Sequence, residues 1–300
     1  MHNYYKEIIM KQKMDFIGFI RILYPPVLYL FFMMMVQTVV GAVLMSIVGV
    51  GNVTNKEAND ILMRYIQEMN VLSMLVSIPI FASIMYYDTV RDKKLNIYVP
   101  MNVQKWWKFL LIIPIAFTTM VGGNNLAIVL AAYMPGDFID KYAKTESLIY
   151  DGSVLVITVS TVILAPIIEE IVFRGIVLKR LNHYFNFVVS AVISAGIFGI
   201  FHLNAVQGVY AFAVGLVLAF IYYNYGIIGC ILLHMCANGF SVLFTFIGSG
   251  AEGSIKDIEF TGDLIQSALT GAGTFAVITV FLMIIIAAVC KKNNVENINQ

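Results

Sequence analysis

Charged side chains are scarce in this sequence. Of its 300 residues, 12% are Asp, Glu, Lys or Arg and 60% are hydrophobic, and the mean hydropathy is +0.84. Soluble domains typically contain about 45–50% apolar and about 25% charged residues. The shortage of charge therefore excludes an ordinary soluble protein. Because the net charge is only +1 and the basic residues form no long tail or patch, we expect no nucleic-acid partner.

Cysteine is also scarce. The three that occur, Cys230, Cys236 and Cys290, lie in apolar runs and form no CxxC motif. Their spacing favours neither a disulfide framework nor a cysteine zinc site, so we interpret them as small core residues. We also expect no cleavable signal peptide, because residues 1–13 are polar and basic and the first apolar run is too long for such a peptide. We expect the first span to remain in the mature protein.

Long apolar runs dominate what is present. A helix that crosses a membrane needs about 20 mostly apolar residues. Eight runs approach or reach this length: 27–50, 71–87, 106–133, 154–178, 187–203, 206–223, 227–247 and 275–289. The sequence predicts an all-α polytopic membrane protein, a bundle of about eight transmembrane helices that forms a single domain over residues 1–300.

The connections between the runs indicate the topology. The first run is expected to start after Pro25-Pro26, and we expect polar connections at 51–70, 135–152 and 248–273. Lys and Arg gather at the N-terminus, in the second connection, at the end of the fourth run and at the C-terminus. With eight spans all four places fall on one side, so the positive-inside rule predicts a multi-pass protein of the cell membrane with both termini in the cytoplasm.

Apart from Lys108 at the start of the third run, five ionisable side chains interrupt these runs: Glu169, Glu170, Arg174, His202 and His234. Such groups are costly inside a membrane and mark functional sites by default. Glu170 and Arg174 are four residues apart, which favours an ion pair on one helix face. Glu169 points about 100° away from Glu170 on an ideal helix. It is therefore able to face a cavity as a candidate general base.

Two further pairs have the same spacing. Phe198 and His202 are four residues apart, as are His234 and Asn238, so each pair shares a helix face. A neutral His and an Asn aimed together are hydrogen-bonding groups that can stabilise negative charge on a carbonyl oxygen. Small residues near His202, including Gly199, allow close helix approach. The three helices are expected to contribute one converging polar set.

The three motifs together resemble a known signature. Glu169-Glu170-x-x-x-Arg174, Phe198-x-x-x-His202 and His234-x-x-x-Asn238, in this order on three apolar segments, are similar to the motifs of the CPBP family, the CAAX protease and bacteriocin-processing intramembrane peptidases. The motif core covers residues 154–243. Any one motif alone is weak, whereas the three together are specific.

The resemblance implies a role for each residue. Glu169 and His202 resemble the pair that activates the attacking water, and His234 with Asn238 resembles the pair that stabilises the oxyanion. Glu170 and Arg174 match the supporting pair, and Phe198 matches a packing position. The implied reaction is hydrolysis of a peptide bond in a membrane-associated peptide or a lipidated, CAAX-like tail, with bacteriocin or signalling-peptide precursors and prenylated C-termini as examples. The implied partners are a peptide or protein substrate and the lipid bilayer.

The cofactor remains open at this point. Members of the family have been described both as glutamate proteases and as metalloproteases, and the sequence has no HExxH motif that would favour zinc. A glutamate peptidase requires no cofactor. A zinc version of the same peptidase would use Glu169, His202 and His234 as ligands.

Each residue taken singly also has a structural explanation. Glu170 with Arg174 is most often a structural ion pair, and a lone His or Asn in a membrane usually hydrogen-bonds between helices. Glu169 alone suits a proton relay. The rival hypotheses are therefore an ion-coupled transporter, whose substrate flux would need Glu169, and a non-catalytic scaffold or bacteriocin-immunity protein, whose function would survive its loss.

The predicted depths of the candidate residues disagree. At about 1.5 Å per residue, Glu169 lies about 15 Å from Lys179, and His234 lies about 10 Å from the start of its run. His202 lies about 22 Å from Phe187 by the same measure. Agreement requires that the fifth run starts below the membrane surface or tilts strongly, or that the fourth run ends before Lys179.

Overall fold

The computed structural model describes residues 13–48, 54–98, 104–150, 152–248 and 258–296. The chain divides into two compact units, which are described separately. Unit 1 comprises Met1–Tyr98 and Lys144–Tyr184, and unit 2 comprises Val99–Ala143 and Phe185–Gln300. Within the described ranges the regular elements are helices and none is a strand, which confirms the all-α prediction.

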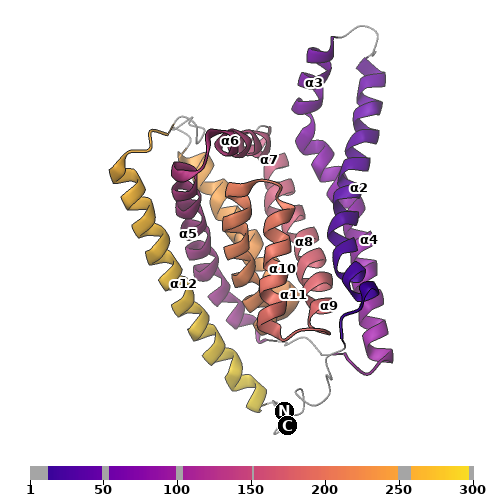
Figure 1. The fold of residues 1–300 in the computed structure, drawn as a ribbon, viewed down its shortest axis with the longest axis vertical. Helices are drawn as coiled ribbons and strands as arrows, with labels where there is room; N and C mark the ends of the chain where they lie inside the picture. Colours follow the sequence, from indigo (N-terminus) through magenta and orange to yellow (C-terminus); the bar gives the residue numbers. More distant parts are fainter. Residues whose placement is uncertain (1–12, 49–53, 99–103, 151, 249–257, 297–300) are drawn as a thin grey trace. The chain divides into compact units, whose positions relative to one another are not determined.

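Unit 1 contains two long helices, one short helix and a composite helix. In Figure 1, α2 and α4 run side by side and α3 joins them at one end. Five consecutive segments make up the composite helix, with π-helical turns in η3 and η4. The elements are α2 (Phe16–Val48), α3 (Asn55–Arg64), α4 (Ile66–Lys94), α7 (Val154–Ile157), η3 (Thr158–Leu164), α8 (Ala165–Glu170), η4 (Ile171–Leu178) and α9 (Lys179–Leu181).

The predicted start of the first helix, after Pro25-Pro26, is wrong. Helix α2 begins at Phe16, where the Asp15 carboxylate accepts a hydrogen bond from the Gly18 N–H at 2.7 Å. A side-chain acceptor at this position satisfies one of the N–H groups that the first helical turn leaves unpaired. Both prolines lie inside the helix.

Pro25 is tolerated because a side chain of another helix compensates for its missing N–H. Proline has no N–H, so Pro25 cannot donate to the carbonyl oxygen of Arg21, four residues earlier. The guanidinium of Arg180, from α9, donates a hydrogen bond to this carbonyl instead. Helix α2 therefore continues through the proline pair, and the Arg21 carbonyl still accepts a hydrogen bond.

Two of the expected polar connections are helical. Within 51–70, Thr54 and Glu57 form a capping box that starts α3, and α4 already begins at Ile66. Within 135–152 lies α6 (Gly136–Tyr150). The charged residues of this segment favour a loop, but Tyr142 and Ala143 of α6 are buried in a cluster with Ala127, Ala131 and Val206. The third connection is partly helical too, because α12 (Gly262–Glu296) begins inside it; its residues 249–257 lie outside the described part of the chain.

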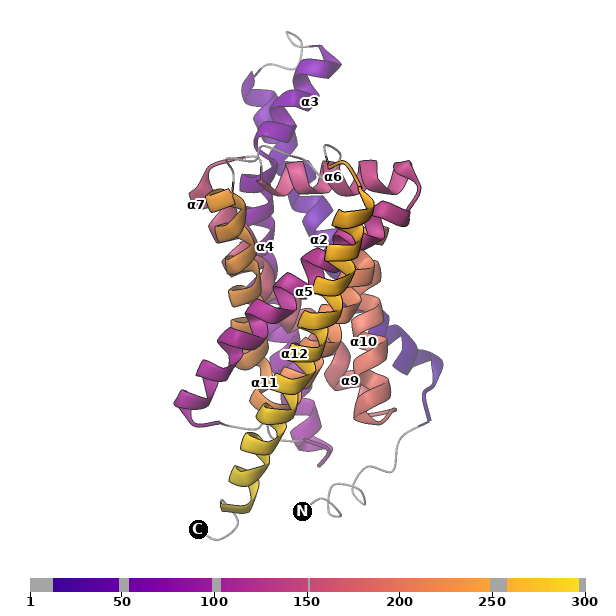
Figure 2. The same ribbon diagram turned by 90° about the vertical axis from the view of Figure 1, so that its left-hand side faces the viewer.

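Unit 2 is built around α5. Helix α12 runs alongside α5, as Figures 1 and 2 both show, while α11 packs on α5 and α10 packs on α11. A short 3₁₀ segment leads directly into α5. The elements are η2 (Trp106–Leu111), α5 (Ile112–Tyr133), α10 (Phe187–Phe201), α11 (Ala205–Gly248) and α12 (Gly262–Glu296).

Helix α11 is two helices joined at Gly226. This residue has φ 69° and ψ −165°, a conformation that is unfavourable for residues other than glycine. The Cys230 thiol lies 3.2 Å from the carbonyl oxygen of Leu218, to which it donates. In a continuous helix these residues would be about 18 Å apart along the axis. The chain therefore reverses at Gly226, and the predicted separate runs 206–223 and 227–247 correspond to the two arms.

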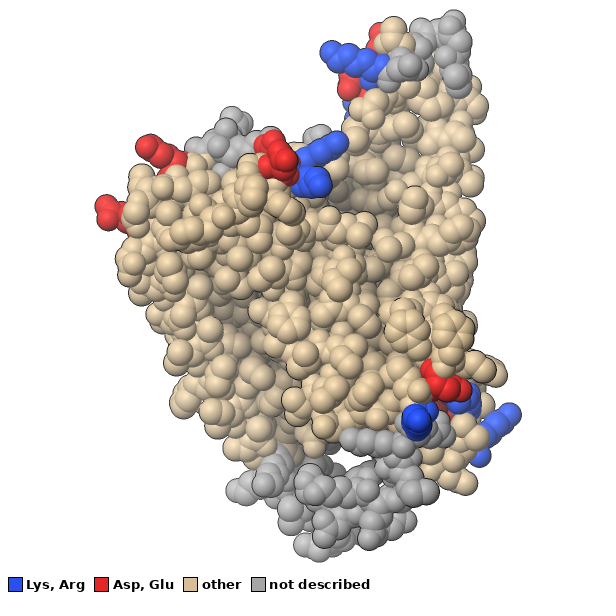
Figure 3. Space-filling model, in the orientation of Figure 1, with Lys and Arg blue, Asp and Glu red and all other residues tan. Residues whose placement is uncertain are grey.

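The predicted number of spans is confirmed approximately. Six helices in the described ranges are long and apolar enough to cross a membrane, and α10 is a shorter apolar helix. Because one of the six is the two-armed α11, the apolar helical segments match the eight predicted runs. On the face of unit 1 seen in Figure 3, charged side chains lie near both ends of the helices and the surface between them is uncharged, as a membrane requires.

Candidate active site

The ion pair predicted on the composite helix is present. Arg174 Nη1 donates to Glu170 Oε1 at 2.9 Å, and both side chains are 0% exposed. Removing one partner of a buried ion pair typically costs about 3–5 kcal/mol, because the other charge is left uncompensated. The neighbouring Glu169 is only half-buried. The two adjacent carboxylates therefore have different surroundings, as their positions on a helix predicted.

The helix around these residues has an irregular hydrogen-bond pattern. The short α-helical segment α8, which carries Glu169 and Glu170, lies between the π-helical segments η3 and η4. Pro166, in the first turn of α8, lacks the N–H that a regular helix would use there. Single π-helical turns within α-helices occur frequently at functional sites. Sequence periodicity did not predict this feature.

Tyr29 is a neighbour of Glu169 that the sequence did not single out. Its side chain is 1% exposed, and it interacts electrostatically with Glu169. The Tyr29 ring packs edge-to-face on Phe81 of α4, with centroids 5.9 Å apart. Helix α2 therefore contributes a buried phenol to the surroundings of Glu169. No local motif signals this electrostatic interaction, because the two residues are far apart in the chain.

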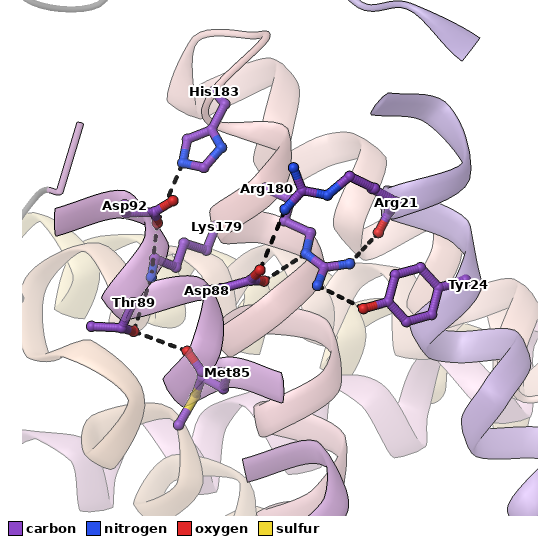
Figure 4. Close-up of polar contacts among 9 residues, drawn as sticks. All are labelled: Arg21, Tyr24, Met85, Asp88, Thr89, Asp92, Lys179, Arg180 and His183. Atoms are coloured by element: carbon purple, nitrogen blue, oxygen red, sulfur yellow. Dashed lines mark hydrogen bonds and ion pairs between the residues drawn. The ribbon is translucent and has the colours of Figure 1, made fainter. Parts of the chain in front are cut away.

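One end of the composite helix is tied to α2 and α4 by Arg180 (Figure 4). Arg180 Nε donates to Asp88 Oδ2 at 2.6 Å, and Arg21 Nη2 donates to Asp88 Oδ1 at 3.4 Å. Arg180 Nη2 also donates to the Tyr24 hydroxyl at 2.9 Å. Asp88 is buried, and two guanidinium groups compensate its charge. The carboxylate on α4 thus links two other helices.

A second acid, one turn further along α4, makes a parallel link. Lys179 Nζ lies 3.0 Å from Asp92 Oδ2 and donates to the Thr89 hydroxyl at 3.0 Å. His183 Nε2 lies 3.6 Å from the same Asp92 oxygen, as Figure 4 shows. Adjacent basic residues at the end of the helix thus face two acids of α4. These contacts hold the end of the helix that carries Glu169.

In unit 2, His202 ends α10 in a defined tautomer. Its Nδ1 lies 2.8 Å from the carbonyl oxygen of Phe198. A carbonyl oxygen can only accept, so Nδ1 carries the proton and Nε2 of the neutral ring keeps its lone pair. The local helix geometry thereby sets the nitrogen of His202 that can accept a proton or a hydrogen bond.

The Phe198 ring connects two of the candidate residues. It makes edge-to-face contacts with His202, at 4.8 Å between centroids, and with His234, at 6.1 Å. The His202 ring reaches back over one turn to Phe198. Asn238 follows His234 by one turn and is half-buried. The structure therefore brings His202 and His234 to one aromatic ring.

The candidate residues form two sets. One set lies in unit 1 and the other in unit 2, and the prediction that they converge stays a prediction. The first set is Glu169, Glu170 and Arg174, and the second is Phe198, His202, His234 and Asn238. Within the described residues no three His, Cys, Asp or Glu side chains are grouped as metal ligands.

Two glycines hold α10 and α11 close together beside His202. A Cβ atom on Gly199 would lie 2.5 Å from the carbonyl oxygen of Gly208, and one on Gly208 would lie 2.9 Å from that of Gly199. Real Cβ atoms do not approach backbone oxygens so closely. The Gly199 carbonyl also accepts the His202 N–H at 3.2 Å. The small residues noted in the sequence thus permit the backbone contact that fixes the end of α10.

The fold and these residues define a class, a polytopic membrane protein with buried ionisable groups on its membrane-spanning helices. Residues 151–240 match the family model Rce1-like, described as type II CAAX prenyl endopeptidase Rce1-like. All three motifs lie within the matched residues, so the resemblance to the CAAX protease family is confirmed. The family implies a protease that acts on a peptide or protein substrate at the membrane. No curated protein and no solved structure matches the chain.

Proposed function

We propose that this protein is an intramembrane endopeptidase that hydrolyses a peptide bond in a membrane-associated peptide or a lipidated, CAAX-like protein tail. The observation that carries the proposal is the match over residues 151–240, which contains all three motifs. The buried Glu170–Arg174 pair and the contacts of Phe198 with both histidines support it, because each places motif residues in an ordered polar environment inside an apolar helix.

In the proposed reaction Glu169 takes a proton from water while His202 Nε2 orients that water. The hydroxide attacks the carbonyl carbon of the scissile bond, and His234 and Asn238 donate hydrogen bonds to the oxyanion. Donors arranged in advance for a developing charge are usually a large part of catalysis. The carbon–nitrogen bond then breaks, and the proton held by Glu169 passes to the leaving amine. No further reactant is needed.

Glu170 and Arg174 have a supporting role in this proposal. Their ion pair is completely buried, so it fixes the turn of helix that also carries Glu169. Such a pair contributes conformational specificity more than net stability.

The test uses a quenched fluorescent peptide that carries a farnesylated CAAX box. We expect the purified wild type to cleave it and Glu169→Ala and His202→Ala to lose about 10²–10⁴-fold in rate, the usual contribution of a general acid–base group. Glu68→Ala, which changes an exposed glutamate of α4, is the matched control. Near wild-type cleavage by both site variants would refute the assignment. Substrate flux in liposomes that Glu169→Gln abolishes, without cleavage, would favour a transporter.

The zinc version of the proposal differs in one measurable respect. It assigns Glu169, His202 and His234 as ligands, and in that case active protein contains stoichiometric metal. Elemental analysis of the purified, active enzyme distinguishes the two versions. Full activity at a substoichiometric metal content would exclude the zinc version.

We also propose that both termini face the cytoplasm. The basic residues at the ends of α4 and α9 support this orientation through the positive-inside rule. A reporter that is active only in the cytoplasm, fused after residue 300, tests it. An active reporter is expected, and activity only for a reporter that requires export would refute the orientation.

A further inference from the structure

The turn between α10 and α11 consists of few residues and has an unusual backbone. His202 and Leu203 end α10 by donating to the carbonyl oxygens of Gly199 and Ile200, at 3.2 and 3.0 Å. Leu203 then adopts φ 55°, a left-handed conformation that is uncommon for residues other than glycine. This lets α11 begin at Ala205 after a single intervening residue. That residue, Asn204, is therefore held two positions from His202.

Asn204 starts α11 with its side-chain oxygen. Oδ1 accepts the N–H of Gln207 at 3.2 Å, and the Asn204 backbone carbonyl accepts the N–H of Gly208 at 2.7 Å. This is the usual role of a residue that precedes a helix. It also fixes the side chain, because the oxygen and nitrogen of the amide are bonded to the same carbon and point in different directions within the amide plane. With Oδ1 turned to the Gln207 N–H, Nδ2 points in another direction.

The amide nitrogen of Asn204 is the part that capping does not explain. Asn204 is 7% exposed, and its Nδ2 has no hydrogen-bond partner among the described residues. Buried donors are almost always paired, and leaving one unpaired is costly. Serine and aspartate cap helices as well as asparagine does, without two N–H groups to bury. The capping role alone would therefore favour a different residue at this position.

We propose that Nδ2 of Asn204 donates a hydrogen bond to a backbone carbonyl oxygen of the bound peptide, next to the scissile bond. The proposal rests on the peptidase function proposed above. A neutral amide donor suits a neutral carbonyl acceptor, and every peptide substrate presents such acceptors at regular intervals. Asn204 would thus position the substrate beside His202, and it is separate from Asn238, which is assigned to the oxyanion.

Two variants separate this role from helix capping. Asn204→Ser and Asn204→Asp keep a side-chain oxygen for the Gln207 N–H but remove the amide donor. We expect both to unfold at nearly the wild-type temperature. For the farnesylated CAAX-box peptide we expect KM to rise about 5–10-fold with kcat within about twofold, the signature of a lost contact that substrate and transition state share.

Asn186→Ser is the matched control. Asn186 caps α10 in the same way, through Val189 N–H at 2.9 Å, but it is exposed. Its substitution is expected to leave KM unchanged. In a second set of peptides, an alkene replaces the peptide bonds one at a time. We expect one of these peptides to have the same KM for the wild type and Asn204→Ser, because it lacks the carbonyl to which Asn204 donates.

The outcomes distinguish this proposal from the proposed function. An unchanged KM in Asn204→Ser and Asn204→Asp, with the wild type active and Glu169→Ala inactive, overturns the role of Asn204 alone. An equal rise of KM in Asn186→Ser shows that capping is responsible and also overturns it. Near wild-type cleavage by both Glu169→Ala and His202→Ala overturns the proposed function, and with it this inference.

Discussion

The contact between Gly199 and Gly208 leads to the sharpest prediction on stability. In Gly199→Ala the new methyl group would lie 2.5 Å from the carbonyl oxygen of Gly208. This oxygen belongs to the backbone of a neighbouring helix, so no change of rotamer can move it away. The two helices must separate, and the end of α10 that carries His202 must move with them.

The magnitude follows from two opposing effects. Replacing glycine by alanine inside a helix gains up to about 1 kcal/mol, because the unfolded chain loses freedom. Overpacking a tight contact costs about 1–3 kcal/mol. We therefore expect Gly199→Ala to lower the free energy of unfolding by up to about 2 kcal/mol. Gly196→Ala, one turn earlier on the same helix, is the control, because within the described ranges no heavy atom of another helix lies within 4 Å of its added Cβ.

The assay compares the two variants in the same detergent. Unfolding by increasing SDS measures the free energies of unfolding. The rate of cleavage of the farnesylated peptide reports whether His202 is still placed for catalysis. Gly196→Ala should be at least as stable and as active as the wild type, whereas Gly199→Ala should be less stable and lose most activity. If the two variants behave alike in both measurements, the inferred backbone contact does not hold α10 in place.

Four other predictions concern unit 1. Arg174→Ala should lower the free energy of unfolding in SDS by about 3–5 kcal/mol, since Glu170 would keep a buried charge without this partner. Arg180→Met should cost about 1–3 kcal/mol in the same assay, because the Arg21 carbonyl and Asp88 lose donors. Tyr29→Phe removes the phenol oxygen that interacts with Glu169 but preserves the ring packing on Phe81, so the rate of peptide cleavage should fall while the free energy of unfolding is unchanged. The pKa of Glu57 is lowered by its hydrogen bonds with Thr54, so the protection factors of the α3 amides, which correct for the intrinsic exchange rate at each pH, should be highest above the ordinary pKa of a glutamate and fall as the pH falls through the lowered value. Protection factors in α3 that are equal above and below the lowered pKa would contradict this role.

Contacts between residues four apart could be predicted from the sequence. The Glu170–Arg174 ion pair and the contact of Phe198 with His202 depend only on helix geometry, which any apolar run of sufficient length supplies. The family resemblance had the same basis, since each motif lies within a few turns of one helix. These local patterns were also enough to place the eight apolar segments.

Contacts between helices could not be predicted in this way. The neighbourhood of Tyr29 and Glu169 and the contact of Gly199 with Gly208 depend on which helices pack together and at what depth. Helix α6 could not be predicted for a related reason, because its buried face becomes evident only from the helices that pack against it. A polar segment between spans is a loop or an amphipathic helix depending on that partner.

The proline pair of α2 shows how a local rule fails when another helix intervenes. The rule that proline interrupts a helix assumes that the freed carbonyl has no other donor. Here the freed carbonyl of Arg21 is the acceptor for Arg180, whose guanidinium also binds Asp88. Arg180 lies eleven residues beyond Glu169 on one composite helix. A proline on α2 thus creates an acceptor that helps to hold the helix bearing the proposed general base, although Pro25 is far from Glu169 in sequence.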